Sequence, residues 1–139
     1  MIAFIEYLMK QLPQKLGSTI IYSPIKVDAL DKGTATAPKR SIAIRTISSP
    51  PLAEYFDGDL LGVSFQVLTS SPNQKESYSS IEAIANELRK FTRRQQPKVS
   101  DKVKLQRLSV AVEPSFVEQN EAKEYIYTAI FRAELLVDE

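Results

Sequence analysis

The sequence contains no cysteine and no histidine. Without cysteine, the chain has no disulfides, no thiolate nucleophile and no thiolate metal ligand. Without histidine, it lacks the usual general base near neutral pH and the commonest metal ligand, which disfavours hydrolytic triads and most zinc or iron sites. Carboxylate chemistry remains open, but no pair of residues has a spacing that argues for it. We therefore expect a protein that is not an enzyme and that carries no metal or cofactor.

A large net charge and a long apolar run are also missing. Lys and Arg total 18 against 17 Asp and Glu, a formal net charge of +1, so no global field draws the protein onto nucleic acid. The apolar runs are too short for a transmembrane helix, and the first residues have neither the basic region nor the cleavage site of a signal peptide. These features predict no membrane partner and a location in the cytoplasm of the producing cell.

Glycine is scarce, and the four glycines, Gly17, Gly33, Gly58 and Gly62, are too far apart to form a phosphate-binding loop. The length of 139 residues suits one domain, spanning residues 1–139, with a real hydrophobic core.

Apolar residues at three- and four-residue steps predict a helix over residues 2–12, which Pro13 should end. Residues 19–22 could form a short strand, and residues 28–40 should be a loop or hairpin tip that a partner could order.

Strict alternation over residues 41–47 and 61–68 predicts two strands that pair antiparallel. Ser71 is a good N-cap for the helix that follows, with Gln74 completing a capping box, and Asn73 with Glu76 offers a second frame. The inner stripe of this helix should carry Tyr78, Ile81, Ile84, Ala85, Leu88 and Phe91.

The last part of the chain predicts two more strands. Residues 103–112 should place Leu108, Val110 and Val112 on one side and end at Glu113-Pro114. After a polar turn at residues 119–124, residues 125–137 are long and apolar on both sides, which is typical of a central strand. The predicted fold class is α+β, a four-stranded antiparallel or mixed sheet with two helices packed mainly on one face.

The second face of this sheet mixes apolar and charged residues, as an assembly surface would. Our candidates for a subunit or partner interface come from this face and from the end of the second helix. They are Arg45, Gln66, Arg93, Arg94, Arg107 and Arg132. The sequence does not decide which face each strand presents.

Two charged clusters have a functional and a structural interpretation. Glu54, Asp57 and Asp59 could hold a hard cation, but Asp-Gly-Asp between two strand patterns is first a turn signal, which we favour. The basic group in residues 89–107 could contact phosphates and make the chain a small nucleic-acid-binding module. A solvated helix end or a subunit contact is the interpretation we favour for it, because acidic residues dilute the group.

The motif Glu54-Tyr55-Phe56-Asp57-Gly58, the strand ending near Ser70 and the Asn73-Gln74 helix together resemble the minor capsid and tail terminator proteins of long-tailed bacteriophages. The end of the chain agrees, with Glu113-Pro114-Ser115-Phe116, a polar turn and Tyr125-Ile126-Tyr127. The resemblance covers roughly residues 41–137 and the first amphipathic helix, and residues 33–40 depart from it.

This resemblance implies that the chain is a structural protein of a virion, which is assembled in the cytoplasm of a host bacterium. A small α+β subunit of this family assembles into a ring, commonly a hexamer, that caps the finished tail tube and docks to the head. The implied partners are other copies of the chain, the tail tube protein and a head-completion or connector protein, with DNA passing through the lumen of the ring. No catalytic or metal-binding residue is implied.

Overall fold

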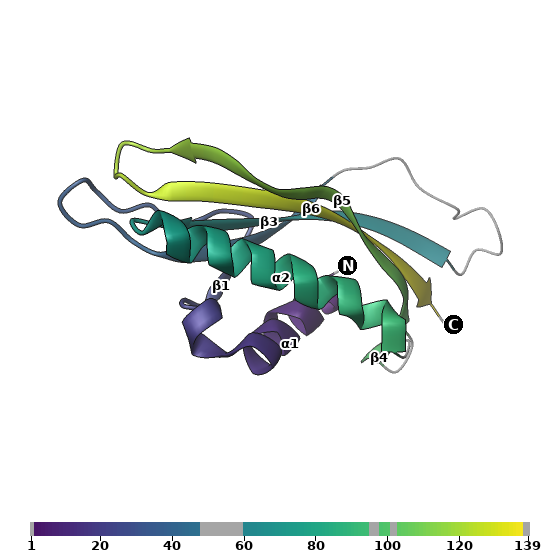
Figure 1. The fold of residues 1–139 in the computed structure, drawn as a ribbon. Coiled ribbons are helices and arrows are strands. Elements are labelled where there is room, and N and C mark those ends of the chain that lie inside the picture. The colour runs from purple at the N-terminus through teal and green to yellow at the C-terminus, as the bar shows by residue number, and fades with distance from the viewer. Residues whose placement is uncertain (1, 48–59, 95–97, 101–102, 138–139) are drawn as a thin grey trace.

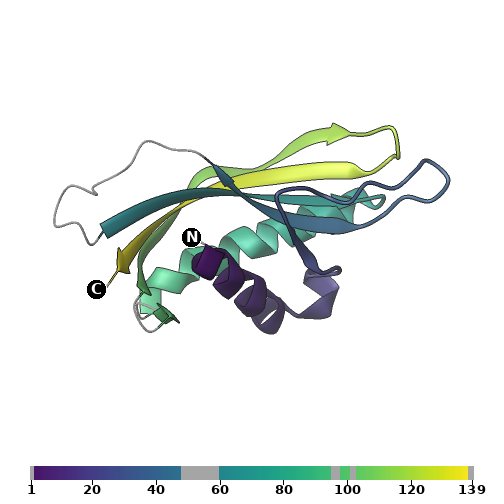
Figure 2. The ribbon, with the colours of Figure 1, turned by 180° about the vertical axis from the view of Figure 1, so that it is seen from behind.

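The computed structural model describes residues 2–47, 60–94, 98–100 and 103–137. The elements in chain order are α1 (Ile2–Ile20), β1 (Ile25–Val27), β2 (Ser41–Ile47), β3 (Leu60–Ser71), α2 (Gln74–Arg94), β4 (Lys98–Ser100), β5 (Val103–Gln119) and β6 (Tyr125–Val137). Both helices lie on one face of a long, curved sheet (Figures 1 and 2). The α+β class and the placement of the helices are as predicted.

The sheet has six described strands in the order β1-β2-β3-β6-β5-β4, so the predicted count of four was wrong. The two extra strands, β1 and β4, lie at the sheet edges and have three residues each. Three residues are too few to show an alternation of apolar and polar side chains, so the sequence did not predict these two strands. β1 pairs parallel with β2 and every other pair is antiparallel, which makes the sheet mixed.

The first helix does not end where the sequence predicted. α1 continues past Pro13, and its conformation breaks only at Gly17, where φ is 80° and ψ is 173°. Pro13 is exposed, so the carbonyl that it leaves without a donor lies on a side of the helix that water can reach. Leu8 and Leu12 are fully buried and hold the helix on the sheet. The short strand predicted for residues 19–22 is absent, because the helical segment reaches Ile20.

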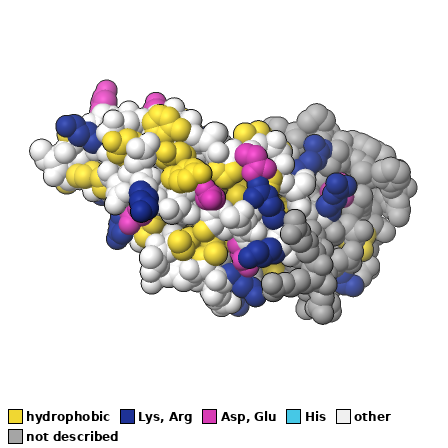
Figure 3. Space-filling view, in the orientation of Figure 1, with side chains coloured by type: hydrophobic (Ala, Val, Ile, Leu, Met, Phe, Trp, Pro, Cys, Tyr) yellow, Lys and Arg dark blue, Asp and Glu magenta, His cyan; other side chains and the backbone are white. Residues whose placement is uncertain are grey.

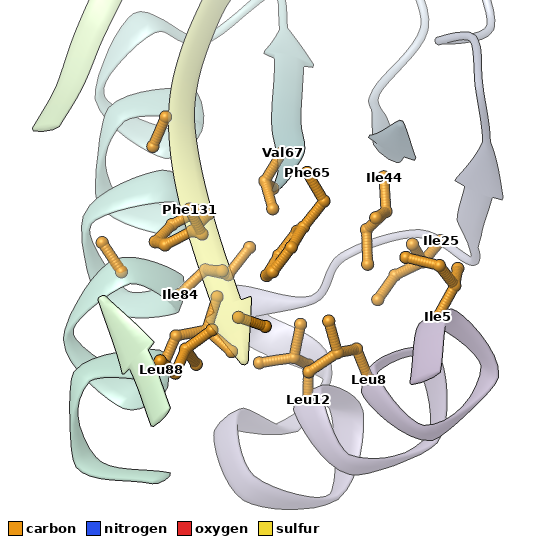
Figure 4. Packing of buried hydrophobic residues seen from close by; sticks show 14 of the residues in the cluster. Ile5, Leu8, Leu12, Ile25, Ile44, Phe65, Val67, Ile84, Leu88 and Phe131 are labelled. Atoms are coloured by element: carbon orange, nitrogen blue, oxygen red, sulfur yellow. The ribbon is translucent and has the colours of Figure 1, made fainter. Parts of the chain in front are cut away.

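The core lies between the two helices and the sheet. Phe65 of β3 stacks on Phe131 of β6 with ring centroids 5.3 Å apart, and Phe4 of α1 meets Phe65 edge-on at 5.5 Å. Leu12 and Leu88 approach this aromatic group from α1 and α2 (Figure 4). All five side chains have 1% or less of their surface exposed, so burial of apolar area is the main force that fixes the helices on this face.

The second helix uses the Asn73 frame. The Asn73 side chain accepts a hydrogen bond from the amide of Glu76 at 3.2 Å, and α2 begins one residue after Asn73. Ser71, which the first frame placed at the N-cap, instead accepts from the amide of Asn73 at 3.0 Å and donates to the Glu76 carboxylate at 2.7 Å. Asn73 is thus the N-cap residue of α2, and Ser71, which precedes the helix, binds both Asn73 and Glu76.

β5 runs through Glu113-Pro114, where a strand end was predicted. Its pairing with β6 shifts register between Leu105 and Arg107, between Val110 and Val112, between Val112 and Ser115, and between Phe116 and Glu118. Such bulges allow a strand to pass a proline, which has no amide hydrogen to donate. The shift after Val110 also turns Val112 away from the helices, so the prediction that Val112 shares one side of the strand with Leu108 and Val110 was wrong.

Candidate subunit interface

The sheet face that points away from both helices, here called the open face, carries four of the six predicted interface residues. Arg45 pairs with Gln66 across β2 and β3, and Gln66 pairs with Ile130 of β6. Arg132 of β6 lies two residues further along the same face, and Arg107 of β5 pairs with Glu134 of β6. The fold thus brings Arg45, Gln66, Arg107 and Arg132 onto one surface.

Arg93 and Arg94 are not on that surface. They form the end of α2, which packs on the opposite face of the sheet, and their side chains lie outside the described part of the chain. The sequence also placed these two arginines at the end of the second helix, apart from the sheet candidates.

The open face is neither a core nor an ordinary solvated surface. Ile130, Arg132 and Glu134 are all half-buried, and the apolar side chain of Val112 next to Ile130 is 43% exposed. Gln66 is fixed by a 2.7 Å hydrogen bond from its Nε2 to the Thr128 hydroxyl. Mixed apolar and charged groups on a rigid sheet match the composition of a protein interface.

The arginines of the open face have no acidic partner within the described residues. Arg45 donates from Nε to the backbone carbonyl of Asp28 at 2.9 Å, and Arg107 and Arg132 make no ion pair with any described carboxylate. Their charges are therefore available to a partner. Among the described residues next to these arginines on the same strand or on the paired strand, Glu134 is the only one with a negative charge.

A long connection between β1 and β2, residues 28–40, lies against the hairpin that joins β5 to β6 and is called the strap from here on. Two backbone amides of the strap, those of Gly33 and Lys39, donate to one oxygen of Glu124 at 2.9 and 2.6 Å. The other Glu124 oxygen accepts from Asn120 at 2.9 Å. Only 1% of Glu124 is exposed, so this chain's own carboxylate orders the segment for which the sequence suggested an external partner.

Glu124 is charged in this arrangement. Burial alone would raise the pKa of its carboxyl, but hydrogen bonds from Asn120 and from the strap amides, with the nearby charge of Lys32, bring that pKa below its ordinary value.

At its tip the strap also forms a tight turn, in which Thr34 and Ala37 exchange two 3.0 Å backbone hydrogen bonds. Gly33 is required there, because a Cβ at that position would lie 2.4 Å from the Ala37 carbonyl oxygen.

The strap is also anchored where it joins β2. The Arg40 guanidinium lies over the ring of Tyr22 at 5.4 Å and pairs with Glu76 at 3.2 Å. The Tyr22 hydroxyl donates to the carbonyl of Ser70 at 2.8 Å. Burial, together with the charge of Glu76, raises the pKa of Tyr22 well above its ordinary value, so this hydroxyl remains a donor.

An exposed aromatic group lies on the outer side of the molecule, where β5 passes the first turns of α2. The Tyr127 ring contacts Tyr78 at 5.5 Å and Phe116 at 5.3 Å, and Phe116 is 51% exposed. Hydrophobic side chains gather over this part of the surface (Figure 3). Tyr78 is 44% exposed, so its predicted place in the inner stripe of α2 was wrong.

The basic group in residues 89–107 is divided by the fold. Arg89 of α2 donates to Asn86 at 2.7 Å and pairs with Glu113 of β5, and Lys90 lies 4.0 Å from Glu87. Arg107 lies on the open face, on the other side of the sheet. The described members of this group are therefore divided between the two sides of the sheet.

The acidic group Glu54, Asp57 and Asp59 lies outside the described residues, as does the motif over residues 54–58 that carried part of the family resemblance. Within the described ranges, no group of three or more acidic side chains is arranged to hold a metal ion. No helix in the described part of the chain is long and apolar enough to cross a membrane.

No protein-family model and no curated protein sequence matches the chain. Its fold, however, is similar to that of a solved chain described as "Virion of native gene transfer agent (GTA) particle", with a TM-score of 0.64 and 14% sequence identity. The match covers 93% of this chain and 91% of that one. At this identity the likeness establishes the shared fold, and it extends over almost the whole of both chains.

Proposed function

We propose that the protein is a structural subunit of a phage-like virion, and more specifically a tail terminator or head-tail joining protein. The observation that carries the proposal is the match in fold, over 93% of this chain, to a chain from the virion of a gene transfer agent particle. That match rests on the arrangement of the backbone, whereas the family resemblance rests on residue types and their spacing. Both point to the same class of protein.

In this proposal the subunit works through its surfaces and is not an enzyme. The whole sequence lacks histidine and cysteine. The open face instead offers half-buried apolar groups beside Arg107 and Arg132, whose charges no described carboxylate pairs with. A second copy of the chain would bury these groups and supply the missing carboxylates.

The specific arrangement we propose is a ring of identical subunits, a hexamer by analogy with the family, that caps the tail tube. One side of the ring would bind the tail tube protein and the other a head-completion or connector protein, with DNA passing through the lumen. Assembly would take place in the cytoplasm of the host bacterium, and the finished protein would be part of the virion.

The experiment is negative-stain electron microscopy of the concentrated protein, alone and mixed with isolated tails. We expect rings in the first sample and capped tube ends in the second. A chain that stays monomeric at every concentration and leaves tail ends bare would contradict the proposal. Salt-sensitive retention on heparin with measurable affinity for duplex or single-stranded DNA would favour the nucleic-acid-binding alternative instead.

A further inference from the structure

A groove of about 520 Å³ lies between α1 and the two outer strands β1 and β2. Most of its lining is apolar and comes from Ile5, Met9, Val27 and Ile44, with Thr46 beside them. Val27 is 55% exposed, so the groove opens at the edge of the sheet. An apolar groove of this size at a sheet edge can receive side chains from another protein surface.

Two carboxylates, Glu6 of α1 and Asp28 after β1, complete the lining of the groove. Neither forms an ion pair with any described cation. The groove is therefore apolar and acidic, and both of its charges are available to a basic partner.

The open face has the opposite character at the other side of the sheet. Arg107 and Arg132 on β5 and β6 are free of ion pairs within the described ranges, and Val112 and Ile130 provide apolar contact area beside them. In the strand order β1-β2-β3-β6-β5-β4, strand β3 lies between the groove strands β1 and β2 and the strands β6 and β5 that carry these groups. One chain thus carries two complementary surfaces on opposite sides.

We propose that the groove of one copy receives the β5-β6 part of the open face of the next copy, with Arg107 and Arg132 facing Glu6 and Asp28. This inference rests on the proposed ring and names the contact that builds it. A contact between two different patches is heterologous, and repeating it head to tail generates a ring when the rotation closes. Opposite charges would set the register of the contact, and the apolar side chains would supply the buried area.

The test uses two charge reversals, Arg107→Glu on the open face and Glu6→Lys in the groove. Each variant alone brings like charges together at every contact, and its self-association should weaken on the order of tenfold or more. In an equal mixture, the reversed face of one variant meets the reversed groove of the other, and every remaining contact is the original one. The mixture should therefore regain rings of alternating composition, seen by sedimentation and negative-stain microscopy.

Two controls separate this contact from a general effect of charge and from a symmetric contact. Lys15→Glu makes the same charge change at an exposed position of α1 outside the groove, and its assembly should equal that of the original chain. Mixing Arg107→Glu with the original chain should weaken assembly, whereas a symmetric contact between two open faces would become stronger. Arg107 pairs with Glu134 across the strands, so Arg107→Glu places two carboxylates opposite each other. If this prevents folding, Arg132→Glu is used in its place.

The inference is overturned if the single variants form rings like the original chain, or if their mixture fails to restore assembly. In either case the original chain still forms rings, the proposed function stands, and the groove has another occupant. If the original chain forms no rings, alone or with tails, the proposed function falls and the inference with it.

Discussion

The two faces of the sheet are built from the same strands and differ in what covers them. On the helix side of β6, Ala129, Phe131 and Ala133 are fully buried. On the other side of the same strand, Ile130 and Arg132 are only half-buried. In the described part of the chain, α1 and α2 cover the first face, and the strap covers the hairpin end of the second (Figure 2). The difference separates residues that hold the fold from residues that are available for assembly.

The largest expected difference between the two faces comes from truncating two neighbours on β6. Phe131→Ala removes a fully buried ring that stacks on Phe65, and the free energy of unfolding should fall by about 3–5 kcal/mol. Ile130→Ala, one residue away on the open face, should cost about 1 kcal/mol or less. Urea unfolding of both variants measures the difference, and similar losses would show that the open face is part of the core.

The strap provides the next largest effect, because its anchor is a single buried carboxylate. Glu124→Ala removes the acceptor of the Gly33 and Lys39 amides, and we expect a loss of about 1–3 kcal/mol. Hydrogen exchange at these two amides should become faster while the amides of β6 keep their protection. Glu121→Ala, an exposed carboxylate in the same hairpin, is the matched control and should change neither measurement.

The same anchor should respond to pH in one direction. The pKa of Glu124 is lower in the folded protein than its ordinary value of 4.5, so its stabilising contribution is complete above that value. The contribution is lost as the pH falls through the lower pKa of the folded state. Exchange at Gly33 and Lys39, corrected for intrinsic rates, should therefore lose protection in acid, and Glu124→Gln should remove this pH dependence.

Much of the fold could be predicted because apolar alternation is a local signal. The strands Ser41–Ile47 and Tyr125–Val137 have the predicted limits, and Tyr125–Val137 lies inside the sheet between β3 and β5, as predicted for a central strand. Prediction failed where a proline was expected to end an element. Pro13 and Pro114 both lie inside elements, because packing of the neighbouring residues and local bulges outweigh the lost hydrogen bond.

The candidate interface could be predicted only in part. Arg45 and Gln66 could be grouped because each stands at an outward position of an alternating strand. The role of Glu124 could not be predicted, because its amide partners lie 85 and 91 residues away in the sequence. The groove also depends on tertiary structure, since α1 and the short parallel strand β1 must come together to form it.

The smallest expected effect is also the one that separates folding from assembly. Arg132→Gln keeps a polar side chain of moderate length on the open face and removes a charge that pairs with no described carboxylate. The free energy of unfolding should change by no more than about 0.5 kcal/mol, because the substitution leaves no cavity and no buried group without a partner. Ring formation should nevertheless weaken if the open face is the subunit interface. A variant with unchanged urea unfolding and unchanged assembly would remove Arg132 from the interface, and a large loss of stability would place Arg132 among the residues that hold the fold.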